Sequence, residues 1–119
     1  LFRSVISGGP MMGFAMYTTD TPITKTSSSI LCMSKDEVSA CEPTACINCG
    51  RCVDACPSRI IPSRLADFAE RHDEEAFLKF NGLECVECGS CSYVCPAKRQ
   101  LKQAIGSMRK TALANKKKK

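Results

Sequence analysis

Two cysteine runs constrain this chain more than any other feature of its sequence. Residues 46–57 and residues 85–96 both follow the pattern C-x2-C-x2-C-x3-C-P. A glycine follows the second cysteine of each run, where the backbone has to turn closely around the group that the thiolates hold. The proline that ends each run stiffens the next turn. The two runs place eight of the ten cysteines at matching positions, which predicts ligation of iron–sulfur clusters.

The spacing within each run also predicts which cysteines share a cluster. In the cysteine run of bacterial two-cluster ferredoxins, three close cysteines surround one cluster and the fourth ligates the other. We therefore predict two [4Fe–4S] clusters with reciprocal ligation. The predicted ligands are Cys46, Cys49, Cys52 and Cys95 for the first cluster, and Cys85, Cys88, Cys91 and Cys56 for the second.

Two other uses of these cysteines fit the pattern less well. Zinc takes four ligands in two pairs, whereas each run supplies a triplet plus one. Disulfides are disfavoured because cysteines this close bridge poorly and nothing in the sequence resembles a secretory signal. Cys32 and Cys41 lie outside the runs. We expect Cys32 to act as a small hydrophobe and Cys41 to be a spare thiol, with a ligand of a degraded motif as the alternative for Cys41.

The segment between the runs favours a mainly α fold. Pro62 suits a first helical position, and apolar residues then recur at helical spacing. Asp73 can cap a second helix, which the pair Asn81-Gly82 would end. These signals predict an α-helical ferredoxin-like domain with two [4Fe–4S] clusters. The only histidine, His72, falls between the helices, where we expect a capping or surface role in preference to iron ligation.

The C-terminal residues 98–119 carry nine of the 17 Lys and Arg and no acid, so the remainder has eight bases against 12 acids. An apolar stripe runs along this segment: Leu101, Ala104, Ile105, Met108 and Ala112. The stripe fits either a basic helix that docks on an anionic membrane surface or acidic partner, or a terminal helix packed on the core. We predict no nucleic-acid partner, because no base-reading motif accompanies the charge.

Residues 1–33 differ in character from the rest of the chain. The glycine-rich stretch 7–13 lacks the residues of a phosphate loop or dinucleotide turn, and we interpret it as a tight turn between strands. Residues 14–17 and 29–33 are predicted strands. The chain begins with Leu1 rather than Met, and we expect it to be part of a longer protein.

The order of these motifs resembles the C-terminal part of RnfC, the peripheral subunit of the ion-translocating ferredoxin:NAD oxidoreductase known as the Rnf complex. The resemblance covers most of residues 7–110. It is carried by the Ser-Gly-Gly-Pro-Met-Met-Gly stretch 7–13, by Pro22-Ile-Thr-Lys25 and Ser29-Ile-Leu31, and by the two cysteine runs that follow. Cys32 departs from the aliphatic residue expected there.

The resemblance implies four parts: residues 1–33 as the C-terminal remnant of a soluble-ligand-binding β-grasp domain, 34–45 as a linker, 46–97 as a two-cluster ferredoxin domain, and 98–119 as a basic C-terminal helix and Lys tail. It implies FMN and NAD(H) in the full-length subunit, outside this chain. It also implies other subunits of the complex as partners, including an iron–sulfur subunit, and a peripheral position on the cytoplasmic face of the cell membrane.

We expect the clusters to relay electrons within a ferredoxin:NAD oxidoreductase that couples electron flow to ion translocation, with no catalytic residue in this chain. Two alternatives remain open: a ferredoxin domain of another flavin-dependent reductase, similar to cobalamin reductases, and a structural docking module stapled by its clusters. Arg51 beside Cys52 and Glu87 beside Cys88 predict a higher reduction potential for the first cluster than for the second.

Overall fold

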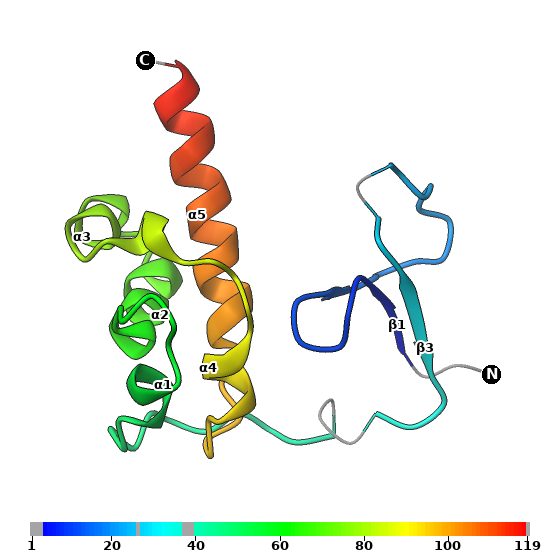
Figure 1. Ribbon diagram of the computed structural model, residues 1–119, viewed down its shortest axis with the longest axis horizontal. Helices are drawn as coiled ribbons and strands as arrows, with labels where there is room; N and C mark the ends of the chain where they lie inside the picture. The colour runs from blue at the N-terminus through cyan, green and yellow to red at the C-terminus, as the bar shows by residue number, and fades with distance from the viewer. Residues whose placement is uncertain (1–3, 26, 37–39, 119) are drawn as a thin grey trace. The chain divides into compact units, whose positions relative to one another are not determined.

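The computed structural model describes residues 4–25, 27–36 and 40–118 (Figure 1). The chain forms two compact units, Leu1–Glu42 and Pro43–Lys119. Residues 37–39 of the predicted linker and Lys119 of the predicted tail lie outside the described residues. In the described ranges, no helix combines the length and the apolar character needed to cross a bilayer.

The first unit contains a small antiparallel sheet of three strands, β1 (Ser4–Ser7), β2 (Phe14–Ala15) and β3 (Ile30–Met33), in the order β2-β1-β3. The two predicted strands are confirmed, although β2 ends at Ala15, and β1 was not predicted. The glycine-rich stretch is the turn from β1 to β2, as expected. A Cβ on Gly13 would lie 2.6 Å from the Gly9 carbonyl oxygen, so this turn requires glycine.

The second unit is helical. Between the cysteine runs lie α2 (Pro62–Glu70), α3 (Glu74–Lys79) and the 3-10 turn η1 (Gly82–Glu84). The helical hairpin predicted there is confirmed: Pro62 occupies the first turn of α2, and the Asp73 carboxylate accepts a hydrogen bond from the Ala76 N–H at 3.0 Å. The runs themselves contain α1 (Arg51–Asp54) and α4 (Ser90–Tyr93), and α5 (Leu101–Lys118) follows the second run.

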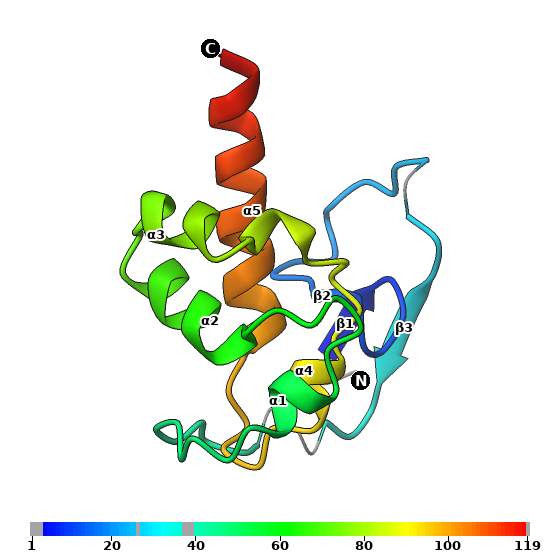
Figure 2. The same cartoon turned by 60° about the vertical axis from the view of Figure 1, so that its left-hand side comes forward.

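The core of this unit lies where α2 and α3 pack against α5, the long helix drawn orange to red in Figures 1 and 2. Leu65, Phe77, Leu101 and Ile105 are at most 2% exposed. The apolar stripe of α5 therefore packs on the core, which is one of the two arrangements that the sequence left open. Burial of such side chains contributes roughly 1.5–3 kcal/mol each.

The two halves of the helical unit repeat one backbone pattern at a spacing of 39 residues, the distance from Cys46 to Cys85. Each run enters its short helix through a left-handed glycine, and α2 and α5 begin at equivalent positions after the two Cys-Pro turns. Three pairs of residues have positive φ at equivalent places: Asn48 and Glu87, Gly50 and Gly89, Arg59 and Lys98. The repeat brings the two runs together, and α1 contacts α4.

Candidate iron–sulfur sites

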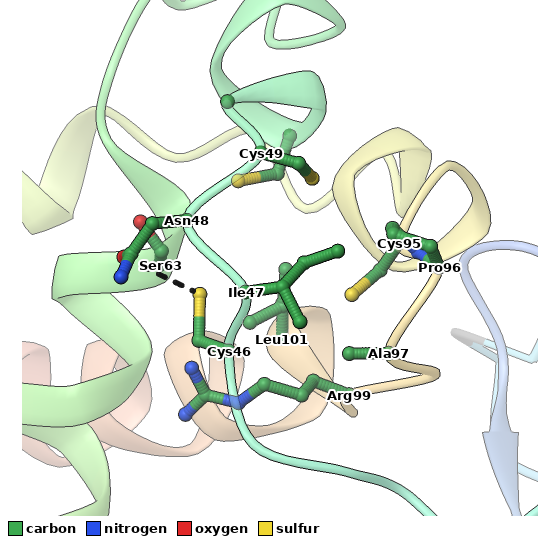
Figure 3. Close-up of a pocket in the computed structure, with 12 residues that line it drawn as sticks. Cys46, Ile47, Asn48, Cys49, Ser63, Cys95, Pro96, Ala97, Arg99 and Leu101 are labelled. Atoms are coloured by element: carbon green, nitrogen blue, oxygen red, sulfur yellow. Dashed lines mark hydrogen bonds between the residues drawn. The ribbon is translucent and has the colours of Figure 1, made fainter.

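A first pocket, of about 110 Å³, is lined by cysteines from both runs (Figure 3). Three come from the first run, Cys46, Cys49 and Cys52, and the fourth is Cys95 from the second run. In Figure 3 the side chains of Cys46, Cys49 and Cys95 lie around the same space. The Cys46 thiol donates to the Asn48 side-chain oxygen at 3.8 Å.

A second pocket, of about 20 Å³, is lined in the same way with the roles of the two runs exchanged. Cys85, Cys88 and Cys91 from the second run line it together with Cys56 from the first. Each pocket thus combines the triplet of one run with the last cysteine of the other. The local cause is the short helix within each run: its second residue is the buried third cysteine, and the fourth cysteine follows the C-cap and belongs to the opposite pocket.

The donor set of each pocket fits a [4Fe–4S] cluster, because four thiols are what such a cluster requires. Within the described residues, no three His, Cys, Asp or Glu side chains are positioned to hold a single metal ion. A cluster places four irons and four sulfides between its thiolates, so its ligands lie further apart than those of one ion. The assignment of the eight ligands stays a prediction.

The two sets of thiols differ in their exposure. Cys46 and Cys49 of the first pocket are exposed, whereas no cysteine of the second pocket is. Burial raises the pKa of Cys91 to about 11, and burial also raises that of Cys85. Cys88 differs, because its hydrogen bond with the Ser90 hydroxyl, 3.4 Å long, lowers its pKa. A thiolate at Cys88 can accept from that hydroxyl, whereas an unligated Cys91 is held as a neutral thiol.

Arg99 is the charged residue that lines the first pocket, and no sequence pattern pointed to it. Its side chain is 12% exposed, and one guanidinium nitrogen donates to Asp67 at 2.8 Å and to Glu70 at 2.9 Å. Burial alone would lower the pKa of Arg99, but the two carboxylates outweigh it and raise the pKa above its ordinary value. Arg51, on which the sequence-based prediction depended, is exposed and does not line the pocket.

Glu87 lines the second pocket, as its place in the run suggested. Its carboxylate accepts a hydrogen bond from Arg109 at 3.1 Å, and its backbone N–H donates to the Cys85 sulfur at 3.4 Å. Lys102 is the other charged residue in this lining. The backbone bond depends on the left-handed conformation of Glu87, whose φ is 55°.

The remaining candidates lie elsewhere. His72 is exposed in the turn after α2 and lines neither pocket, which agrees with the expected surface position. Cys32 lies in β3 and Cys41 near the end of the first unit; both are exposed, and neither lines a cysteine pocket. Cys32, expected to act as a small hydrophobe, lies on the exposed side of β3.

A comparison with protein families matches residues 45–99 to the 4Fe-4S dicluster domain. Residues 45–99 are thus similar to a ferredoxin-like iron–sulfur domain. The described residues of the chain contain five α-helices and a small three-stranded sheet. The match covers both cysteine runs and ends two residues before α5.

Three curated relatives extend the likeness beyond the cysteine runs. The C subunit of the Na(+)-translocating ferredoxin:NAD(+) oxidoreductase complex of Acetobacterium woodii is 44% identical over 96% of this chain and 26% of its own length. Its proton-translocating counterpart in Clostridium ljungdahlii is 52% identical over 85% of this chain and 22% of its own length. The C subunit of the ion-translocating oxidoreductase complex of Yersinia pestis is 44% identical over 60% of this chain and 12% of its own length. The chain spans about a quarter or less of these relatives, and their names confirm the predicted resemblance to RnfC.

Proposed function

We propose that this chain, which is similar over most of its length to part of the RnfC subunits of ion-translocating ferredoxin:NAD(+) oxidoreductases, relays electrons through two [4Fe–4S] clusters. The observation that supports this most directly is the composition of the two pockets, each of which gathers three cysteines of one run and the last cysteine of the other. Eight thiols divided in this way match the reciprocal ligand pattern of two-cluster ferredoxins.

A bound [4Fe–4S] cluster would take up and release one electron at a time. The chain itself fixes the distance between the two sites, because each cysteine run contributes to both pockets. Apolar side chains form part of each wall: Leu101 lines the first pocket, and Ile60 and Ile105 line the second. No large motion of the protein is needed between sites that share their ligand segments.

The further parts of the function rest on the relatives. In the full-length subunit we assign FMN and NAD(H) to regions outside this chain, and residues 1–33 to the end of a β-grasp domain. We propose other subunits of a membrane complex as partners, an iron–sulfur subunit among them, on the cytoplasmic face. Because the apolar stripe of α5 is buried, contact with an anionic membrane would rest on its basic side chains alone.

The decisive experiment is iron and sulfide analysis of anaerobically prepared protein, followed by a redox titration monitored by EPR. The relay predicts two clusters that are reversibly reduced in the physiological range. A purely structural role predicts clusters that resist such reduction, and bound zinc in place of iron would refute the proposal. In the full-length subunit, the relay allows assembly of Cys52→Ser to survive while electron flow stops. Cys41→Ser, at an exposed cysteine outside both pockets, is the matched control. Loss of assembly together with electron flow would instead support the docking module.

A further inference from the structure

Two ion pairs of opposite orientation lie at the two cysteine pockets. At the first pocket, the lining residue is the cation Arg99, and its carboxylate partners Asp67 and Glu70 do not contribute to the lining. At the second pocket, the lining residue is the anion Glu87, and its partner Arg109 does not contribute. Each pair therefore turns a different sign of charge toward its pocket.

The pair at the first pocket is held firmly. The Arg99 guanidinium bonds two carboxylates of α2, both under 3 Å, and its own side chain is 12% exposed. Both carboxylates are more open to water, with side-chain exposures of 38% for Asp67 and 58% for Glu70. Water screens the exposed carboxylates more effectively than it screens the buried cation, so the cation dominates the field inside the pocket. Figure 3 shows the guanidinium on the side of the pocket where Cys46 lies.

The pair at the second pocket is arranged the other way. Glu87 and Arg109 have similar exposures, 23% and 30%, so neither is screened much more than the other. Because Glu87 lines the pocket and Arg109 does not, the carboxylate is the nearer charge. Lys102 also lines this pocket and opposes the carboxylate. The net field at the second pocket is therefore weaker than at the first.

We propose that Arg99 and Glu87 are the residues that set the two clusters at different reduction potentials, Arg99 raising the potential of the first and Glu87 lowering that of the second. The physical reason is that reduction adds a negative charge, which a nearby cation stabilises and a nearby anion destabilises. The ion pairs hold these two charges in place. Arg99 and Glu87 therefore act on the clusters through their electric field and do not ligate iron. The inference rests on the proposed function, because it needs both clusters.

The test is an EPR-monitored redox titration of the anaerobic protein and of variants at Arg99, Glu87 and Arg51, with Asp67→Asn in reserve. Arg99→Gln should lower the ratio of reduced to oxidised first cluster at least about threefold at the wild-type midpoint, with the second cluster unchanged; a tenfold change would correspond to 59 mV for one electron. Arg99→Lys keeps the positive charge, so its ratio of reduced to oxidised first cluster should stay close to that of the wild type. Glu87→Gln should raise the second cluster's ratio by a smaller factor, because Lys102 already opposes the carboxylate.

Arg51→Gln is the charge-matched control, because Arg51 lies within the first run but is exposed and outside the pocket lining. Its shift should be smaller than that of Arg99→Gln. An equal or larger shift would overturn the inference, as would unchanged midpoints in Arg99→Gln and Glu87→Gln. If Arg99→Gln fails to assemble, Asp67→Asn removes one opposing charge and should raise the first potential; an unchanged or lowered potential there would overturn the inference. Wild-type protein without iron and sulfide would instead refute the proposed function.

Discussion

Reciprocal ligation makes a sharp prediction about which thiols are lost from a cluster when the last cysteine of a run is removed. Cys56→Ala would remove a proposed ligand from the pocket of the second run, although Cys56 belongs to the first run. We expect iron and sulfide to fall by about half, because one of two equal clusters is lost. The cysteines left without a cluster should be Cys85, Cys88 and Cys91.

Alkylation with iodoacetamide, followed by peptide mass mapping, identifies those thiols directly. Thiols bound to a cluster are protected, whereas thiols released from it react as thiolates. The exposed Cys32 and Cys41 should be labelled in every variant and serve as the internal standard. In Cys56→Ala the triplet of the second run should gain label, and in Cys95→Ala the triplet of the first run should gain it.

The rates of labelling follow from the pKa directions at the second pocket, provided that the local fold persists. At pH 8 about one in a thousand Cys91 thiols would be ionised at a pKa of about 11, against about one in ten at the ordinary value of 9.0. Cys88 should react first, because its pKa is lowered. Cys91 should react on the order of tenfold more slowly than an ordinary thiol, because the greater nucleophilicity of its more basic thiolate offsets part of the loss in ionised fraction. Label gained instead by Cys46, Cys49 and Cys52 in Cys56→Ala would refute reciprocal ligation.

Three further predictions concern the scaffold. Phe77→Ala removes a fully buried ring and should destabilise the helical unit by roughly 3–5 kcal/mol. Phe80→Ala, at a residue that is 41% exposed, should cost clearly less. Equal losses of stability in thermal unfolding of the cluster-loaded protein would contradict a core centred on Phe77. Asp73→Ala removes the cap of α3 and should cost about 1 kcal/mol in the same assay, with Asp73→Asn retaining most of the stability. Removal of iron with a strong chelator should abolish most of the far-UV circular dichroism of α2 and α5, because cluster binding and folding are coupled in domains with a small hydrophobic core. A helical signal that survives complete removal of iron would argue against that coupling.

Local signals predicted the helices of the second unit well. Pro62 begins α2 because its fixed φ and missing N–H are tolerated in a first turn, and Asp73 caps α3 through its own carboxylate. The stripe of α5 marked its buried face, although the sequence left open whether the protein core or a membrane would cover it. Strand β1 was missed, because Ser4–Ser7 is short and becomes a strand only by pairing with β2 and β3.

The cysteine spacing by itself predicted iron–sulfur chemistry and the division of the cysteines into triplets, because that spacing acts through turns of a few residues. Only the tertiary structure decided which charges face the two pockets. Arg99 is held by carboxylates 32 and 29 residues earlier in the chain, and Glu87 by an arginine 22 residues later. No local pattern encodes such pairs, because they exist only once α2 and α5 have packed beside the cysteine runs.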